Sequence, residues 1–168
     1  MTYEGLCLLK SEHVLDGFDC GKPALDDWLV RRALGNQANG RSRTWVTTEG
    51  GSKRVVAFYS SSTASVLRTR APKSPLVIQP KKTLTILLGR MAIDSRHQGE
   101  HLGSALLQHF MIKAIAVAAA IGVRLLLVHA KDEEDKAFYA HNGLIESPLN
   151  TLTMLMLLPL DARQHLRR

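Results

Sequence analysis

The chain has 168 residues, the size of one domain with a substantial core, and its two cysteines and scattered histidines show no metal-ligand spacing. Its net charge of +7 favours polyanionic partners, among them nucleic acid. There is no basic and apolar leader, and the longest apolar run, 114–122, is about half of the ~20 residues that span a bilayer. We therefore expect a cytoplasmic protein without a metal site or a membrane partner.

The first part of the chain is predicted to form a strand and then a helix. Residues 4–9 are apolar and predict the strand. Pro23 suits the first turn of the helix, because its missing N–H has no partner there in any case. The apolar stripe of this helix recurs at helical spacing at Leu25, Trp28, Leu29 and Ala33. Gly35-Asn36 is expected to break the helix, and Gly40 to end the segment that follows.

A hairpin is predicted next. Its strands are 44–48 and 55–65, joined by the turn 49–52, which contains two glycines. The region 72–80 contains three prolines and is expected to be a loop, since proline removes a backbone donor.

The second half of the chain predicts a strand–helix–strand unit followed by a short helix and a last strand. These elements are expected at 83–94, 102–122, 123–128, 135–141 and 152–158. The first two strands should be parallel, because a crossover helix joins them in a right-handed βαβ unit. Ligands of such units bind beyond the carboxyl ends of the strands.

The turn between the strand at 83–94 and the helix at 102–122 is polar and rich in glycine and charge. A turn whose N–H groups open a helix can hold phosphate, because those groups lack partners and the helix dipole favours an anion. Such turns are common, so the residues alone leave a plain helix N-terminus as an equal alternative.

The motif Gln98-Gly99-Glu100-His101-Leu102-Gly103 resembles the acyl-CoA-binding turn of the GNAT N-acetyltransferase family, Gln/Arg-x-x-Gly-x-Gly/Ala. Residues 137–144, AFYAHNGL, resemble the family's Phe-Tyr-x-x-x-Gly-Phe signature. Residues 18–48 resemble the opening of the GNAT toxins of bacterial type II toxin–antitoxin modules. The resemblance implies an α/β (α+β) fold, with a mixed central sheet flanked by helices and a parallel βαβ core. We expect one domain over 1–160 and a basic tail over 161–168.

The same resemblance implies acetyl-CoA as the cofactor. Backbone N–H groups of the turn would hold its diphosphate, and backbone groups of the preceding strand its pantetheine and thioester. The cofactor-binding residues that the resemblance implies are Met91, Ala92, Ile93, Gln98, Gly99, Glu100, His101, Leu102, Gly103, Ser104, Ala105, Asp132 and Phe138.

His101 is a departure from the family turn, which has glycine at this position. A glycine there permits a positive φ or a close approach of the backbone to phosphate, and a Cβ obstructs either. Glu100 adds a repulsive charge. We hypothesise that a partly protonated His101 offsets some of that repulsion. The variant His101→Gly should then bind CoA equally or more weakly.

Tyr139 is a packed core aromatic or, by the resemblance, the general acid that protonates the leaving CoA thiolate. A phenol with a pKa of about 10 keeps its proton at pH 7, so the proton is available. No residue stands out as a general base, since Asp94, His129, Asp132 and Glu133 also fit as surface charges. This favours an α-amine acceptor, whose pKa near 8 leaves part of it neutral, over a lysine amine.

The resemblance to the toxins implies that the acceptor is the α-amine of an amino acid carried on tRNA, and that its acetylation stops translation. Basic residues then become candidates for a groove that holds tRNA, although a solvated surface is the plainer interpretation of each and a structural ion pair that of Arg90. These candidates are Arg31, Arg32, Arg41, Arg43, Lys53, Arg54, Lys81, Lys82 and Arg90.

The toxin resemblance also implies a homodimer and a ribbon-helix-helix antitoxin, which alone would contact operator DNA. Two alternatives remain open at the level of sequence. One is an ordinary GNAT enzyme that acetylates a small amine or a protein N-terminus, and the other is a module that binds CoA without catalysis.

Overall fold

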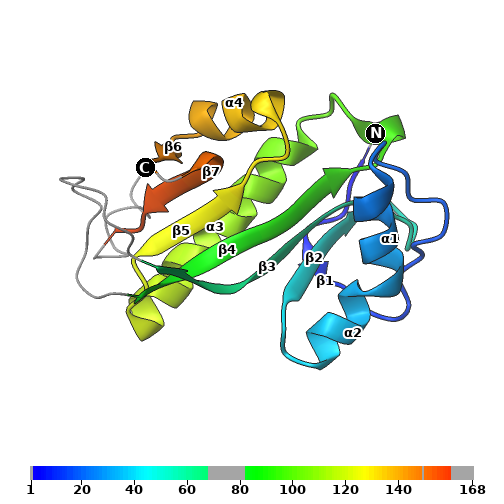
Figure 1. Cartoon of the computed structure of the whole chain (residues 1–168). Coiled ribbons are helices and arrows are strands. Elements are labelled where there is room, and N and C mark those ends of the chain that lie inside the picture. The colour runs from blue at the N-terminus through cyan, green and yellow to red at the C-terminus, as the bar shows by residue number, and fades with distance from the viewer. Residues whose placement is uncertain (1, 68–81, 149, 160–168) are drawn as a thin grey trace. The chain divides into compact units, whose positions relative to one another are not determined.

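The computed structural model describes residues 2–67, 82–148 and 150–159 (Figure 1). The predicted loop at 72–80 and the tail at 161–168 lie outside the described residues. In chain order the elements are β1 (Cys7–Leu8), α1 (Pro23–Arg31), α2 (Ala33–Ala38), β2 (Arg43–Thr48), β3 (Val55–Leu67), β4 (Lys82–Ile93), the 3-10 helix η1 (Ser95–His97), α3 (Leu102–Ile121), β5 (Leu125–His129), α4 (Glu133–His141), β6 (Ile145–Ser147) and β7 (Asn150–Leu157).

The strands form a mixed sheet in the order β1-β2-β3-β4-β5-β7-β6. β4 and β5 are parallel, from the pair Thr85–Leu125 to the pair Leu88–Val128, as the predicted βαβ unit requires. The β1–β2, β2–β3, β5–β7 and β6–β7 pairs are antiparallel. The α/β class with a mixed sheet and helices is therefore confirmed.

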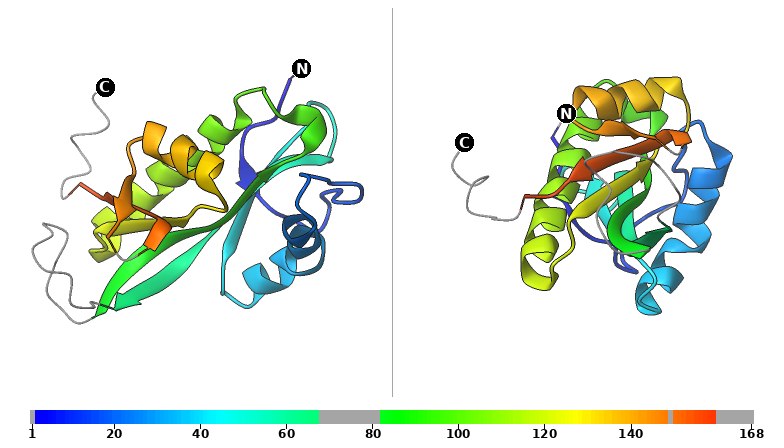
Figure 2. Two further views of the ribbon diagram at one scale, coloured as in Figure 1. Left: turned by 45° about the horizontal axis from the view of Figure 1, so that its top comes forward. Right: turned by 60° about the vertical axis from the view of Figure 1, so that its left-hand side comes forward.

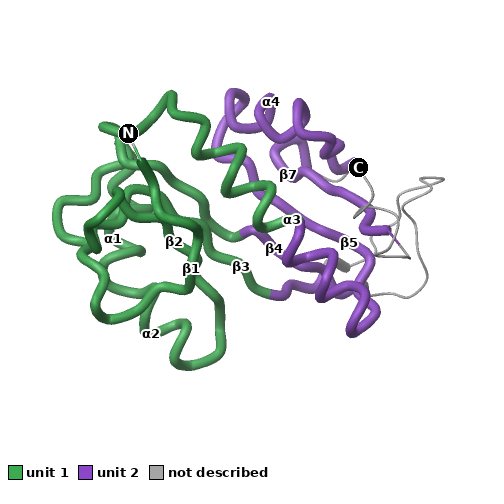
Figure 3. The backbone as a smooth tube through the Cα atoms, turned by 180° about the vertical axis from the view of Figure 1, so that it is seen from behind, with its two compact units in different colours: residues 1–62, 89–111 green, residues 63–88, 112–168 purple. Residues whose placement is uncertain are grey.

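The chain divides into two compact units, which are described separately (Figure 3). Unit 1 comprises residues 1–62 and 89–111, and unit 2 comprises residues 63–88 and 112–168. The chain passes from one unit to the other within β3, within β4 and in the middle of α3. The turn that follows β4 belongs to unit 1, whereas α4 belongs to unit 2.

In unit 1, β3 has a helix on each of its faces. Phe58 stacks on Trp28 of α1, with ring centroids 6.1 Å apart, whereas Tyr59 contacts Phe110 of α3 at 5.6 Å. Adjacent residues of a strand point to opposite faces, so α1 and α3 lie on opposite sides, as the right-hand view of Figure 2 also shows. Trp28 is 7% exposed, and burying such a side chain contributes roughly 1.5–3 kcal/mol.

In unit 2, β5 is buried on both faces. Its residues Leu125 to Val128 are all 8% exposed or less, and they lie between β4 and β7. α4 contacts β7 and β6 (Figure 1). By length and composition alone α3 could cross a membrane, with a mean hydropathy of 1.6 over its most apolar window. This is weak evidence, because the core helix of a soluble protein passes the same test.

Three predictions about elements were wrong. The first strand is only Cys7–Leu8, the two residues that form a continuous ladder with Trp45 and Val46 of β2. The helix breaks at Arg32, where φ is −121° and ψ is −27°, and Gly35-Asn36 lies inside the short α2. The third error is an omission, because the sequence did not predict β6. This strand is defined by its antiparallel pairing with β7, which no local sequence pattern indicates.

Candidate active site

The turn after β4 starts with a capped 3-10 helix and continues through two left-handed residues. The Asp94 carboxylate accepts a hydrogen bond from the Arg96 N–H at 3.0 Å and so caps η1. Gly99 follows with φ of 84° and His101 with φ of 60°. Among the described residues His101 is the one non-glycine with a positive φ. For a side chain other than glycine this conformation costs about 1–2 kcal/mol.

The N-terminus of α3 has N–H groups that the helix itself leaves free. The first to reach a backbone carbonyl is that of Ala105, which donates to His101 O at 3.3 Å. Within the described chain no acceptor is found for the N–H groups of Leu102, Gly103 and Ser104. These three donors and the helix dipole favour an anion at this end of α3. The turn therefore has the chemistry of a phosphate site.

The strand before the turn offers its backbone rather than its side chains. Ala92 is 5% exposed and packs in the apolar core of unit 1, and Met91 is buried too. The β4–β5 pairs end at Leu88–Val128, so the stretch from residue 89 to Ile93 is not paired with β5. Where a ladder between two neighbouring strands ends, an extended ligand can bind through hydrogen bonds to the backbone.

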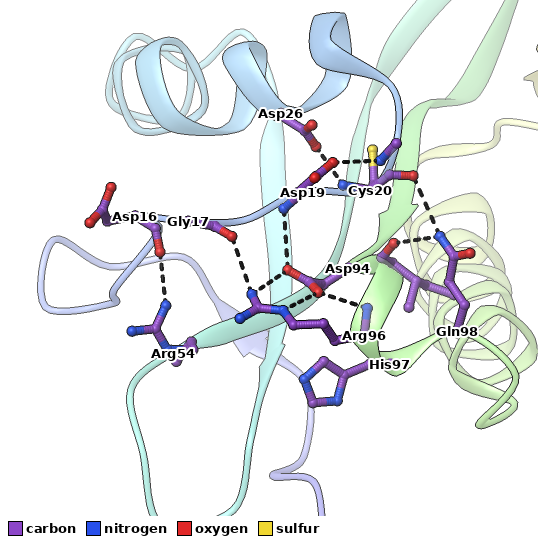
Figure 4. A network of polar contacts seen from close by, with 12 residues as sticks. Asp16, Gly17, Asp19, Cys20, Asp26, Arg54, Asp94, Arg96, His97 and Gln98 are labelled. Carbon is purple, nitrogen blue, oxygen red and sulfur yellow. Dashed lines mark hydrogen bonds and ion pairs between the residues drawn. The ribbon is translucent and has the colours of Figure 1, made fainter.

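A network of polar contacts holds the start of this turn (Figure 4). The Asp94 side chain is fully buried and forms an ion pair with Arg96 at 2.8 Å. The hydrogen bonds from Arg96 lower the pKa of Asp94 to about 2. Asp94 therefore has a structural role. Of the four residues considered as a general base, it is the least suitable, because Arg96 already occupies its carboxylate.

Tyr139 lies on α4 in unit 2, with its ring enclosed. The residue is 2% exposed, and its ring contacts that of Phe138 at 5.3 Å. Burial raises the pKa of Tyr139, with a further contribution from Asp135, so the phenol keeps its proton at neutral pH. No hydrogen bond to its hydroxyl is found in the described chain, and this oxygen is not among the buried atoms that lack a partner. The phenol is therefore a neutral group that still carries a proton to donate.

The other candidate bases of the sequence also lie in unit 2, and each has a structural role or is exposed. Asp132 caps α4, accepting from Asp135 N at 2.8 Å. The His129 ring contacts the Thr153 hydroxyl at 3.2 Å, and Glu133 lies near Lys136 at 3.9 Å. In the part of the chain that the structure describes, no group of three or more His, Cys, Asp or Glu could hold a metal ion.

The basic residues predicted for a tRNA groove fall into two groups. Arg31 pairs with Asp27 at 2.7 Å, and Lys53 pairs with Glu12 at 3.1 Å. Arg54 donates to the backbone carbonyl of Asp16 at 2.8 Å.

A second group has no carboxylate partner among the described residues: Arg32, Arg41, Arg43 and Arg90. Arg32 lies at the junction of α1 and α2, and Arg41 and Arg43 follow α2. Lys81 lies outside the described residues, as does the side chain of Lys82.

Arg90 lies over the Trp28 ring, with 4.3 Å from its guanidinium carbon to the ring centroid. Burial lowers the pKa of Arg90, and no carboxylate compensates for the lost hydration. The sequence left a structural ion pair as the alternative role of Arg90. In the structure Arg90 forms a cation–π contact instead. Sequence reasoning missed this contact and the Asp94 network, because both join segments that are far apart along the chain.

The structure thus gathers Met91, Ile93 and the turn in unit 1, and Asp132, Phe138 and Tyr139 in unit 2. Residues 40–144 match the model of the family described as acetyltransferase (GNAT) domain.

Over 146 residues, 87% of this chain and 86% of the relative, the sequence is 43% identical to a tRNA-acetylating toxin of Mycobacterium tuberculosis. Two solved structures are similar as well. AtaTR bound with AcCoA has a TM-score of 0.80 at 25% identity, covering 91% of this chain and 92% of that chain. The KacTA–DNA complex has a TM-score of 0.76 at 26% identity, covering 93% of each.

Proposed function

This chain belongs to the GNAT acetyltransferase family, and from that membership we propose that it moves the acetyl group of acetyl-CoA to the α-amine of the amino acid on a charged tRNA. The N-acetylated amino acid can no longer accept a growing peptide, so translation stops. The proposed acceptor rests on one observation. The Mycobacterium tuberculosis relative, 86% of whose length is covered by the match, is a tRNA-acetylating toxin.

Acetyl-CoA is the proposed donor, bound at the turn after β4. The free N–H groups of Leu102, Gly103 and Ser104 would hold its diphosphate, and backbone groups of Met91 and Ile93, beyond the last β4–β5 pair, would hold its pantetheine arm. The similar AtaTR structure is bound with AcCoA, which supports this assignment. The backbone supplies these contacts, so the side chains of the turn are free to vary.

Tyr139 is the proposed general acid. The neutral α-amine attacks the thioester carbonyl, a C–N bond forms, and the C–S bond breaks. The departing CoA thiolate takes the phenolic proton of Tyr139, and the amine nitrogen gives up a proton to water. A proton from water then returns to the Tyr139 phenolate and restores the acid. The enclosed ring and the raised pKa, which keeps the phenol protonated at neutral pH, support this role.

The tRNA backbone is proposed to lie against the arginines without carboxylate partners, Arg32, Arg41, Arg43 and Arg90. A cation already paired with a carboxylate must give up that pair to bind phosphate, so Arg31 and Lys53 should contribute less. Each phosphate contact contributes about 0.9 to the slope of log affinity against log salt. Replacing Arg41 or Arg43 by Ala should therefore lower that slope by about one.

The same proposal includes the partners expected of such a toxin. These are a ribbon-helix-helix antitoxin that alone contacts operator DNA, a second copy of this chain in a homodimer, and a cytoplasmic location. Residues 1–160 are proposed to act as one domain.

The test is transfer of labelled acetyl from acetyl-CoA to total aminoacylated tRNA, with Tyr139→Phe beside the wild type. Deacylated tRNA is the control, because it offers the same phosphates without the amine. We expect label on charged tRNA only, decreasing as salt rises and almost absent with Tyr139→Phe. Binding of acetyl-CoA without labelling of charged tRNA would contradict the acceptor, and absence of binding would contradict the donor.

A further inference from the structure

Asp94 links the turn after β4 to the loop that precedes α1. Its carboxylate accepts from Arg96 Nε and Nη2, both at 2.8 Å, and from Arg96 N at 3.0 Å. It also accepts from Asp19 N at 3.2 Å, and Asp19 lies 75 positions away in the sequence. A single carboxylate with 0% exposure thus joins two distant segments of unit 1 (Figure 4).

Three further hydrogen bonds run between the same two segments, 16–20 and 94–98. Arg96 Nη2 donates to Gly17 O at 3.2 Å, and Ser95 N donates to Asp19 O at 2.8 Å. The Gln98 side-chain amide donates to Cys20 O at 3.4 Å and to Ile93 O at 3.1 Å. We call these two segments, with the bonds that join them, the clasp.

Each segment of the clasp leads directly into a part of the proposed site. Segment 94–98 continues into Gly99 and His101, whose left-handed backbone sets the direction of the free N–H groups of α3. Segment 16–20 continues into α1, and Asp26 of α1 in turn caps Cys20 N at 2.9 Å. α1 carries Trp28, on which Arg90 rests.

We infer that Asp94 and Arg96 are positioning residues that hold the diphosphate turn and the start of α1 in one arrangement, so that acetyl-CoA and RNA meet pre-formed sites. The inference rests on the proposed function. Asp94 is fully buried, so it acts on a ligand through the clasp and not by contact. A fixed turn binds more tightly than a mobile one, because the ordering cost has been met before the ligand arrives.

The sign of the effect separates positioning from direct electrostatics. Asp94 carries a negative charge near a site for a diphosphate, so Coulomb interaction alone predicts tighter binding of acetyl-CoA when the charge is removed. Positioning predicts the opposite. In Asp94→Asn the side chain keeps only one acceptor oxygen, so it cannot accept hydrogen bonds from both Nε and Nη2 of Arg96. Contacts between the two segments of the clasp are then lost, and binding of acetyl-CoA weakens.

The experiment measures acetyl-CoA binding by calorimetry and steady-state transfer to charged tRNA for wild type, Asp94→Asn and Arg96→Lys. We expect KM for acetyl-CoA and for charged tRNA to rise about tenfold or more in Asp94→Asn, with a smaller rise in Arg96→Lys. The value of kcat should stay within about threefold, because Tyr139 lies in unit 2 and the clasp does not include it.

The matched control is Glu12→Gln, which breaks the exposed ion pair with Lys53 in the same unit. It should leave the KM for acetyl-CoA unchanged, because neither residue of that pair belongs to the clasp or to the turn after β4. A loss confined to kcat, or equal or tighter binding of acetyl-CoA by Asp94→Asn, would overturn the inference. Should Asp94→Asn not fold by circular dichroism, Arg96→Lys decides, because it keeps the positive charge and loses the two-pronged contact with Asp94. Coulomb interaction then predicts unchanged binding of acetyl-CoA, whereas positioning predicts weaker binding.

The two proposals fail in different ways. Wild-type protein that does not bind acetyl-CoA contradicts the proposed function. Wild-type protein that binds, beside an Asp94→Asn variant that binds equally, contradicts only the clasp.

Discussion

The segments after β4 and after β5 both begin with a capping aspartate, but the surroundings of the two aspartates differ. Each parallel strand is followed by an aspartate that caps the next helix, Asp94 for η1 and Asp132 for α4. Asp94 has 0% exposure and an arginine partner, whereas Asp132 is exposed at the start of its helix. A capping aspartate thus lies at the surface in unit 2, whereas in unit 1 it is the centre of a network of hydrogen bonds.

The difference extends to what each segment presents to a ligand. After Asp94 the chain turns through Gly99 and His101 and offers backbone donors, with no side chain required. After Asp132 the chain enters α4 at once, and this helix carries the proposed acid, Tyr139. Binding of an anion by backbone tolerates changes of sequence, while proton transfer by a phenol does not. Substitutions in the two segments should therefore differ in both kind and size of effect.

The largest effect is expected at α4. Tyr139→Phe removes the proposed acid and should lower kcat for acetyl transfer by about 10²–10⁴-fold, the usual contribution of a general acid. The ring stays in place, so the melting temperature and the affinity for acetyl-CoA should change little. Single-turnover transfer and calorimetry measure the two quantities. A variant with wild-type kcat would remove Tyr139 from the mechanism.

The next effect compares the two caps directly. Asp94→Asn should lower the free energy of unfolding by about 2–4 kcal/mol, because it breaks a buried ion pair. Asp132→Asn should cost only a few tenths of a kcal/mol, because asparagine caps a helix as well as aspartate does. Urea unfolding of both variants beside the wild type gives the two values. Equal losses would mean that Asp94, too, is only a cap.

The free energy of unfolding should also depend on pH because of Asp94. The folded-state pKa of Asp94 is lowered from 3.8 to about 2, so its ionised form stabilises the fold above pH 4. That stability, about 1–2 kcal/mol after allowing for the exposed Arg96, is lost as the pH falls from about 4 to 2. Unfolding measured across this window should be steeper for wild type than for Asp94→Asn. Parallel curves would contradict the lowered pKa.

The smallest effect is expected at His101. Because its φ is 60°, His101→Gly should relieve backbone strain and raise the free energy of unfolding by about 0.5–1 kcal/mol, after the greater freedom of glycine in the unfolded chain is subtracted. Affinity for acetyl-CoA should stay equal or fall, since the imidazole no longer offsets Glu100. Thermal unfolding and calorimetry measure these changes. A clear gain in affinity would show that the histidine only obstructs the turn.

By itself the sequence determined what depends on neighbours along the chain. The helix that starts at Pro23, the hairpin around the turn 49–52 and the parallel pair β4–β5 all follow from periodicity, turn residues and the handedness of a crossover. The turn at Gln98–Gly103 and the position of Tyr139 were also found in the sequence, because each forms a contiguous motif. Their roles in binding and catalysis remain predictions.

Only the tertiary structure decided which charges have partners. Asp94 and Asp19 are 75 positions apart, and Arg96 and Gly17 are 79 apart, so no local pattern could link them. The same holds for Arg90 over Trp28 and for Lys53 with Glu12, whereas the pair Arg31–Asp27 lies within one helix, four positions apart. Periodicity indicates which side of an element is buried. The partner of a buried charge depends on which distant segment the fold brings beside it.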